Sequence, residues 1–79
     1  MGKNPTLVIS NRLKELRAGR GLTQEDLAQA VGVTRVTINY IENGEYRPSL
    51  ELAFLLARFF KMGIEEIFRV EAPYGKNRS

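Results

Sequence analysis

The sequence contains no cysteine and no histidine. Without cysteine it forms neither disulfides nor thiolate metal sites, and without histidine it lacks the commonest general base and the commonest metal ligand. Serine–histidine and cysteine–histidine catalytic arrangements are excluded as well, and no glycine-rich phosphate loop is visible. We therefore expect no enzyme activity, no bound metal and no cofactor.

Long apolar runs are lacking too. The longest, residues 7–9 and 52–57, are far too short to cross a bilayer. The N-terminus, with one lysine and a three-residue apolar run, does not have the composition of a secretory signal. We expect a protein of the cytoplasm, within the nucleoid, with no membrane partner.

The length of 79 residues predicts one domain with a small core. A core of this size rarely supplies more than about 3–5 kcal/mol, so small domains usually need a disulfide, a metal or a partner. Because the first two are excluded, oligomerisation remains. Twelve Lys and Arg residues against nine Asp and Glu residues give a net charge of +3, which suits nucleic acid without identifying it.

Five helices are predicted from cap residues at their starts and glycines at their ends. Ser10 or Asn11 caps the first helix, which ends near Ala18. Thr23, with Asp26 three residues later, forms the start of the second helix as a capping box. The remaining helices are expected at residues 35–43, 50–60 and 64–68, after caps at Thr34 and Ser49 and after Met62 or Gly63.

The two ends of the chain are expected to form short arms. Residues 6–9 have a strand-like composition after Pro5, and residues 69–72 could form a second strand. The two segments can pair within one chain or between chains. The predicted organisation is an N-terminal arm at 1–10, a helical domain at 11–68 and a C-terminal arm and tail at 69–79.

Two short helices joined around Gly32 form the most informative pattern. The turn needs glycine because the chain reverses with positive φ and the second helix approaches the first closely. On the third helix, about 100° per residue places Ile38 and Ile41 on the buried side. The outward side carries Arg35, Val36, Asn39 and Tyr40.

These outward residues suit the major groove of DNA. A helix face that merely meets water usually carries Lys and Glu instead. Arg35 can donate two hydrogen bonds to guanine, Asn39 can form a hydrogen-bonded pair with adenine, and Val36 can contact a thymine methyl group. Tyr40 can reach a phosphate or a sugar. An exposed valine needs no explanation by itself, so the assignment of Val36 depends on its neighbours.

The chain contains LTQEDLA at 22–28, VGVT at 31–34 and INYIENG at 38–44. Together these stretches closely resemble the Cro/CI-type (Xre) helix-turn-helix family, and PSL at 48–50 and IEEIF at 64–68 extend the resemblance. It covers roughly residues 11–68. The resemblance implies an all-α, five-helix, lambda-repressor-like fold with the third helix in the major groove of double-stranded DNA.

The resemblance also implies contacts with phosphates. Gln24 and Thr34 stand at helix N-termini, where free amides and the helix dipole favour phosphate. In the family the loop after the recognition helix touches the DNA backbone, which here points to Asn43 and Arg47. Glu45 departs from the family pattern, in which a basic residue often stands there, and predicts weaker or differently angled binding.

Other charged residues are assigned structural roles. In this family a pair like Arg17 and Glu42 bridges the first and third helices, so we expect a structural ion pair. Glu65 and Glu66 fall in the first turn of the last helix, where the dipole favours acids, and no nucleophile, base or metal accompanies them for catalysis. A solvated basic face is expected for Arg12, Lys14 and Arg20.

The fourth helix has more apolar residues than one buried stripe needs. The expected inward stripe consists of Leu50, Ala53, Leu56, Ala57 and Phe60. This leaves Phe54, Leu55 and Phe59, which are covered either by the folded-back arms or by a second copy of the chain. We expect a homodimer, with a seam formed by Leu55, Phe59, Phe68 and Val70.

Together these patterns predict a sequence-specific transcriptional repressor. As a dimer it would place its two recognition helices in successive major grooves of an inverted repeat. The alternative is an antitoxin-like or other protein-interaction module of the same fold, with a protein partner. The surplus apolar residues of the fourth helix favour that alternative, and the outward face of the third helix opposes it as the only function.

Overall fold

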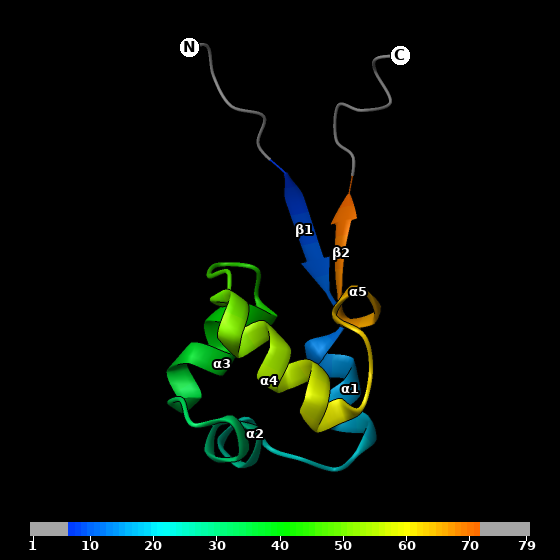
Figure 1. The fold of residues 1–79 in the computed structure, drawn as a ribbon. Helices are drawn as coiled ribbons and strands as arrows, with labels where there is room; N and C mark the ends of the chain where they lie inside the picture. The colour runs from blue at the N-terminus through cyan, green and yellow to red at the C-terminus, as the bar shows by residue number, and fades with distance from the viewer. Residues whose placement is uncertain (1–6, 72–79) are drawn as a thin grey trace, which may run out of the picture.

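The computed structural model describes residues 7–71, and its elements confirm the expected five helices with strand-like ends. Figure 1 shows the helices gathered in one body, from which the two strands project together as a ribbon. In chain order the elements are β1 (Val8–Asn11), α1 (Leu13–Gly19), α2 (Gln24–Val31), α3 (Arg35–Glu42), α4 (Leu50–Phe60), α5 (Ile64–Ile67) and β2 (Phe68–Glu71). Within this part of the chain, no helix is long and apolar enough to span a membrane.

The two strands pair antiparallel within one chain. Ile9 lies opposite Val70 and Asn11 lies opposite Phe68, which decides how the two arms pair. The strands are shifted from the expected segments: β1 begins two residues later than predicted, and β2 begins one residue earlier. Because Phe68 already has extended φ and ψ of −113° and 128°, α5 ends at Ile67. Thr6 and Ala72 lie outside the described residues.

Polar side chains fix the starts of the helices. The Thr23 hydroxyl accepts from the Asp26 N–H and the Asp26 carboxylate accepts from the Thr23 N–H, both at 2.9 Å, as the capping box predicts. Asn11 acts at two places, because its Oδ1 accepts from the Leu13 N–H at 3.0 Å and its Nδ2 donates to the Ile41 carbonyl at 2.9 Å. The N-cap of α1 is Arg12, which makes no side-chain capping bond, so the expected cap at Ser10 or Asn11 is wrong by one or two residues. Asn11, one residue earlier, supplies an acceptor for the first turn and ties the end of β1 to α3.

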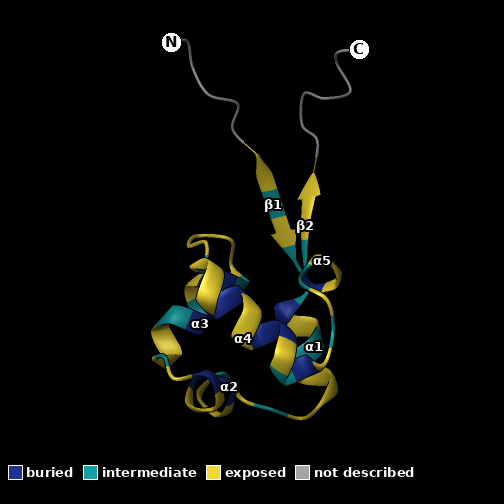
Figure 2. Ribbon diagram, in the orientation of Figure 1, coloured by how far each residue is buried: buried dark blue, intermediate teal, exposed yellow. Residues whose placement is uncertain are grey.

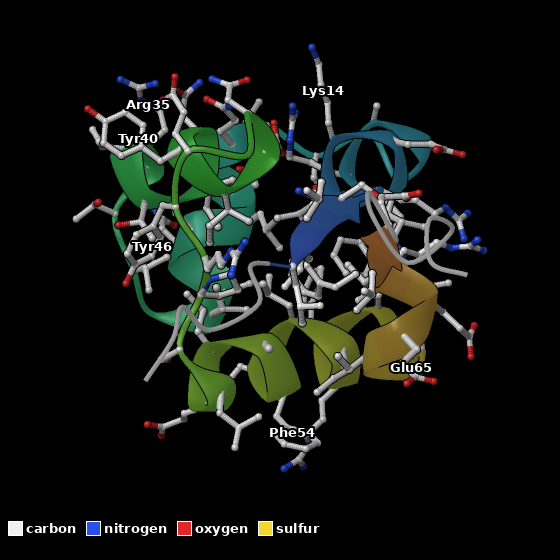
Figure 3. The ribbon with its side chains drawn as sticks, turned by 90° about the horizontal axis from the view of Figure 1, so that it is seen from above. Lys14, Arg35, Tyr40, Tyr46, Phe54 and Glu65 are labelled. Atoms are coloured by element: carbon white, nitrogen blue, oxygen red, sulfur yellow. The ribbon has the colours of Figure 1, made fainter. Side chains whose placement is uncertain are left out.

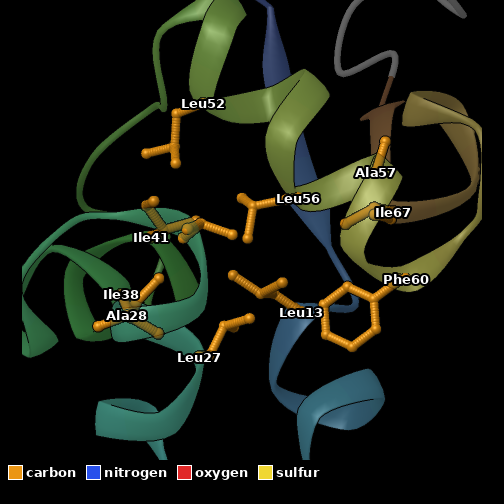
Figure 4. Close-up of a cluster of buried hydrophobic side chains, with 11 residues drawn as sticks. Leu13, Leu27, Ala28, Ile38, Ile41, Leu52, Leu56, Ala57, Phe60 and Ile67 are labelled. Carbon is orange, nitrogen blue, oxygen red and sulfur yellow. The ribbon is translucent and has the colours of Figure 1, made fainter.

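Every helix contributes to one core, which Figures 2 and 4 show between α4 and the other helices. The side chains of this core are apolar, and removing their apolar surface from water supplies the main favourable contribution to folding. The largest fully buried side chains are Leu13, Leu27, Ile38, Ile41, Leu56 and Ile67.

The predicted inward position of Leu50 is wrong. Its side chain is 72% exposed, and Leu52, at 7%, takes its place in the core. Turned at about 100° per residue, Leu50 falls at the edge of the buried stripe, in the first turn of α4, where it borders an open groove. Of the surplus residues, Phe54 and Leu55 are exposed, whereas Phe59 packs against the core and meets the Phe60 ring edge-on at 5.0 Å.

The turn between α2 and α3 depends on backbone conformation at Gly32, which has φ 79° and ψ 31°. A Cβ there would meet no atom within 4 Å, so Gly32→Ala introduces backbone strain alone. We expect it to lower the free energy of unfolding by about 1–2 kcal/mol, measured by urea denaturation. Gly19→Ala is the matched control: it also has open space, and its φ is not positive, so it should leave stability unchanged or raised. Equal losses from both would contradict the argument.

Candidate nucleic-acid interface

One face of α3 is open to solvent and the other is buried. Ile38 and Ile41 are at most 1% exposed, whereas Val36 and Tyr40 are each 48% exposed. Figure 3 shows Arg35 and Tyr40 pointing to the same side of the molecule. Arg35 is exposed as well and Asn39 is half-buried, so the four residues predicted to read bases are all at least partly accessible on this side of α3.

Asn39 and Asn43 lie together on this face. The Asn43 Nδ2 donates to the Asn39 Oδ1 at 3.3 Å, one helical turn apart. Asn43 is the C-cap of α3, so the helix is one residue shorter than predicted. The contact joins a predicted base reader to a predicted phosphate contact and limits how the Asn39 amide can turn.

A buried ion pair braces α3 against α1. The Arg17 Nε donates to one Glu42 oxygen at 2.7 Å and its Nη2 donates to the other at 3.1 Å. The Glu42 side chain is 2% exposed and that of Arg17 is 13% exposed. The hydrogen bond to Glu42 raises the pKa of Arg17 despite its burial, so the guanidinium stays charged. Arg17 also donates to the Leu22 carbonyl at 2.8 Å, which holds the segment before α2.

Gln24 connects this pair to the exposed face. Its Nε2 donates to the Glu42 Oε1 at 3.0 Å, and its Oε1 accepts from the Arg35 Nη1 at 3.5 Å. The buried carboxylate thus orients the Gln24 amide, and the amide in turn holds Arg35. The Glu42 carboxylate thereby positions both Gln24, a predicted phosphate contact, and Arg35, a predicted base reader.

The other predicted phosphate contacts are engaged within the protein. The Thr34 hydroxyl accepts from the Thr37 N–H at 3.3 Å and caps α3. The Arg47 Nη2 donates to the Leu7 carbonyl, which ties the loop after α3 to the segment entering β1. Glu45, the departure from the family pattern, is exposed in this loop.

Lys14 is solvent-exposed, as expected, and it lies on the same side of the molecule as the outward face of α3 (Figure 3). It is exposed on α1 and points to the same side as Arg35 and Tyr40 in Figure 3. A signal was available, because Lys14 lies three residues before Arg17 and residues three apart share a helix face. Arg17 contacts α3, so Lys14 lies on the side of α1 nearest to it.

Arg12 and Arg20, the other basic residues assigned to that face, make structural contacts. The Arg20 guanidinium lies over the rings of Phe59 and Phe60 and donates to both of their carbonyls, at 3.3 and 3.2 Å. The Arg12 Nη1 donates to the Glu66 carbonyl at 3.3 Å. Both arginines therefore fasten α1 to the C-terminal part of the fold.

The helix pair and its turn match a known family model, described as helix-turn-helix (HTH_3), over residues 13–67. The chain belongs to this family. Members of the HTH_3 family of the Xre, or Cro/CI, type are DNA-binding transcriptional regulators. The protein is therefore a transcriptional regulator with a DNA-binding helix-turn-helix, in which α2 and α3 form the motif.

Individual relatives agree with this assignment. The chain is 56% identical over 63 residues to an HTH-type transcriptional regulator of Methanocaldococcus jannaschii, covering 80% of this chain and 96% of that protein. It is 48% identical over 63 residues to the HTH-type transcriptional regulator YgzD of Bacillus subtilis, with the same coverage. The crystal structure of the restriction-modification controller protein C.AhdI from Aeromonas hydrophila superposes with a TM-score of 0.64 at 36% identity, covering 70% of this chain and 83% of that one.

Removing the buried negative charge should destabilise the domain. Glu42→Gln leaves the Arg17 guanidinium in the interior without its counter-charge, and breaking such a buried pair lowers stability by about 3–5 kcal/mol. Glu15→Gln is the control, because it removes an exposed pair with Arg12 at 3.8 Å that is worth less than about 1 kcal/mol. Thermal and urea unfolding measure both variants, and a Glu42→Gln loss no larger than the control would refute the role of the brace.

Proposed function

We propose that the protein is a sequence-specific transcriptional repressor that binds an inverted-repeat operator as a homodimer. The observation that carries this proposal is the outward face of α3, where Arg35 is held by Gln24 and Asn39 is held by Asn43. Side chains held in place lose less conformational freedom on binding DNA. The proposed base readers are Arg35, Val36, Asn39 and Tyr40.

Phosphate contacts position this face in the major groove. We assign them to Gln24 and to Lys14, which flank α3 on the side to which Arg35 points. The N–H groups that follow Thr34, together with Asn43, supply further donors at the two ends of α3. Arg47 joins them only if it releases the Leu7 carbonyl.

The mode of action follows from the binding geometry. A two-fold axis would place the two α3 helices in successive major grooves about 34 Å apart. Occupancy of the operator would exclude other proteins from it, which suffices for repression in the nucleoid without any catalytic step. A transcription assay in vitro with and without the operator tests this mode.

The second candidate function is an antitoxin-like protein-interaction module. Phe54 favours it, because this ring is 52% exposed and points away from the side of Arg35 in Figure 3. Such a module can bind DNA as well, so the two functions are compatible. Copurification of one protein in a fixed ratio, lost in Phe54→Lys, would support this candidate.

Loss of a base reader should relax sequence preference. After the preferred site has been selected from random DNA, Arg35→Ala or Asn39→Ala should weaken binding to it by about 1–3 kcal/mol, with little effect on unrelated DNA. Arg58→Ala is the matched control for Arg35→Ala, since it removes an equal charge from an exposed position on α4. Equal losses on preferred and unrelated DNA would make the two residues backbone contacts.

Loss of a phosphate contact should act on all sequences alike. Lys14→Ala should weaken binding uniformly and reduce the slope of log K against log salt by about 0.9, the value for one phosphate neutralised. Gln24→Ala should leave the slope unchanged, because the amide carries no charge, but it also frees Arg35 and should therefore weaken binding to the preferred site more than to unrelated DNA. Titrations at several salt concentrations measure both effects. An unchanged slope in Lys14→Ala would remove Lys14 from the interface.

A further inference from the structure

Two hydrogen bonds fasten β1 to the end of α3 and to the loop that follows it. The Asn11 Nδ2 donates to the Ile41 carbonyl at 2.9 Å, and the Arg47 Nη2 donates to the Leu7 carbonyl. Asn11 is the last residue of β1 and Leu7 directly precedes the first, so the two bonds hold both ends of the strand. The strand therefore runs beside the loop that carries Arg47.

The Leu7 carbonyl lies on the free edge of β1. Directly opposite residues of an antiparallel pair alternate between hydrogen-bonded and non-hydrogen-bonded pairs. The Arg12 N–H donates to the Ile67 carbonyl at 2.9 Å, and these two residues continue the register of the ribbon. Steps of two residues outward from this bonded pair lead to Val8, so Val8 is bonded to β2 and the Leu7 carbonyl points away from it. Arg47 therefore occupies an acceptor that strand pairing leaves free.

Packing contributes little to the attachment of the outer end of β1. A hollow of about 220 Å³ lies between the strand and the loop, and its wall includes Leu7, Tyr46, Arg47 and Pro48. Leu7 and Val8 are 43% and 47% exposed. Atoms that border a hollow lose the dispersion contacts that close packing would give them. The hydrogen bond from Arg47, rather than packing, ties this end of the strand to the loop.

Arg47 is a charged group bonded to a neutral acceptor. It is exposed, and within residues 7–71 it forms no ion pair. A guanidinium group has five N–H donors, and the bond to Leu7 uses one of them. A phosphate offers the same group a negative charge and two acceptor oxygens in a bidentate pair. A phosphate within reach is therefore a stronger partner for Arg47 than the Leu7 carbonyl.

The loop places Arg47 where such an exchange would bear on DNA binding. The Glu45 N–H donates to the Tyr40 carbonyl at 2.8 Å across Gly44, whose φ is 77°, and this fixes the start of the loop to the end of α3. Figure 3 shows Tyr46, the neighbour of Arg47, at the same edge of the molecule as Tyr40. The loop thus leaves α3 beside its outward face.

We propose that the ribbon restrains Arg47 and thereby lowers the affinity of the protein for DNA of any sequence. Binding exchanges the Leu7 carbonyl for a phosphate, and the loss of the first contact reduces the gain from the second. Because coupling is reciprocal, bound DNA loosens the outer end of β1 by the same factor. The proposal rests on the proposed DNA-binding function and adds a regulatory role: a firmer ribbon weakens DNA binding, and a looser one strengthens it.

A double-mutant cycle tests the restraint. Val8→Pro removes the N–H that pairs with β2 and so frees the outer end of the strand, with the adjacent Leu7 carbonyl, without changing any charge. It should raise the affinity for preferred and unrelated DNA alike by about three- to tenfold, the effect of one hydrogen bond. In an Arg47→Ala background Val8→Pro should change nothing, because the restrained group is absent. Val8→Thr is the matched control, since it keeps the N–H and the branched shape and should bind DNA like the unmodified protein.

The exchange can also be observed by NMR in the unmodified protein. Two signals should shift when a duplex of random sequence is added: the Arg47 Nε–H, and the Val8 amide, whose peptide group contains the Leu7 carbonyl. Hydrogen exchange of the Val8 amide should accelerate in the complex, whereas that of Ser10, the next bonded position inward, should not. Thermal unfolding checks the fold of Val8→Pro, and if that variant is too unstable for binding studies the NMR result decides.

The proposal is overturned if Val8→Pro fails to raise the affinity, if its gain persists in Arg47→Ala, or if Val8→Thr gives the same gain. An Arg47 signal that DNA leaves unchanged would overturn it as well. Arg35→Ala separates these outcomes from failure of the proposed function. If Arg35→Ala weakens the preferred site but the cycle shows no coupling, the restraint alone is refuted. If the coupling is present and Arg35→Ala has no effect, the reading face is refuted and the restraint remains.

Discussion

The Glu42 carboxylate is the group on which the position of α3 depends. It accepts two hydrogen bonds from Arg17 and one from Gln24, and its side chain is almost fully buried. A buried carboxylate is tolerated only when its charge and its lone pairs are both matched, and here both are. The three donors come from α1 and α2, so one charge fixes α3, which carries Glu42, relative to both. Because Gln24 also accepts from Arg35, the same charge reaches the exposed surface.

The rest of the fold supports this arrangement from two sides. The apolar core sets the separation of the helices, with fully buried side chains from each of them. Side-chain caps at Thr23, Thr34 and Ser49 fix where the helices begin, and this determines which residues face outward. On the opposite side, Arg20 and Arg12 fasten α1 to α4 and α5. The outward face of α3 is therefore the outer layer of a unit braced on both sides, and the ribbon projects from a different side of the molecule (Figures 1 and 3).

Local patterns predicted much of this structure because their causes are local. A cap needs only a side-chain oxygen near free amides, and the left-handed turn needs only a residue without a Cβ at Gly32. The expected burial of Leu50 was wrong because helical periodicity gives the direction in which a side chain points. It does not show whether a neighbouring element reaches far enough to cover that side chain. Residue spacing could not place Lys14 on the same side as Arg35 (Figure 3), because its direction depends on where α1 lies relative to α3. No single helix contains that information.

Residue spacing and cap chemistry are enough to predict the five helices, the turn and the outward composition of α3. The sequence also indicated the family, through motifs whose residues are needed for one geometry. Three features become visible only in the folded chain: the two ends pair with each other, Gln24 joins a buried charge to Arg35, and Leu50 borders the same groove as Ile9 and Phe68 of the ribbon. These features join residues distant in sequence, and such contacts are set by the packing of the whole domain.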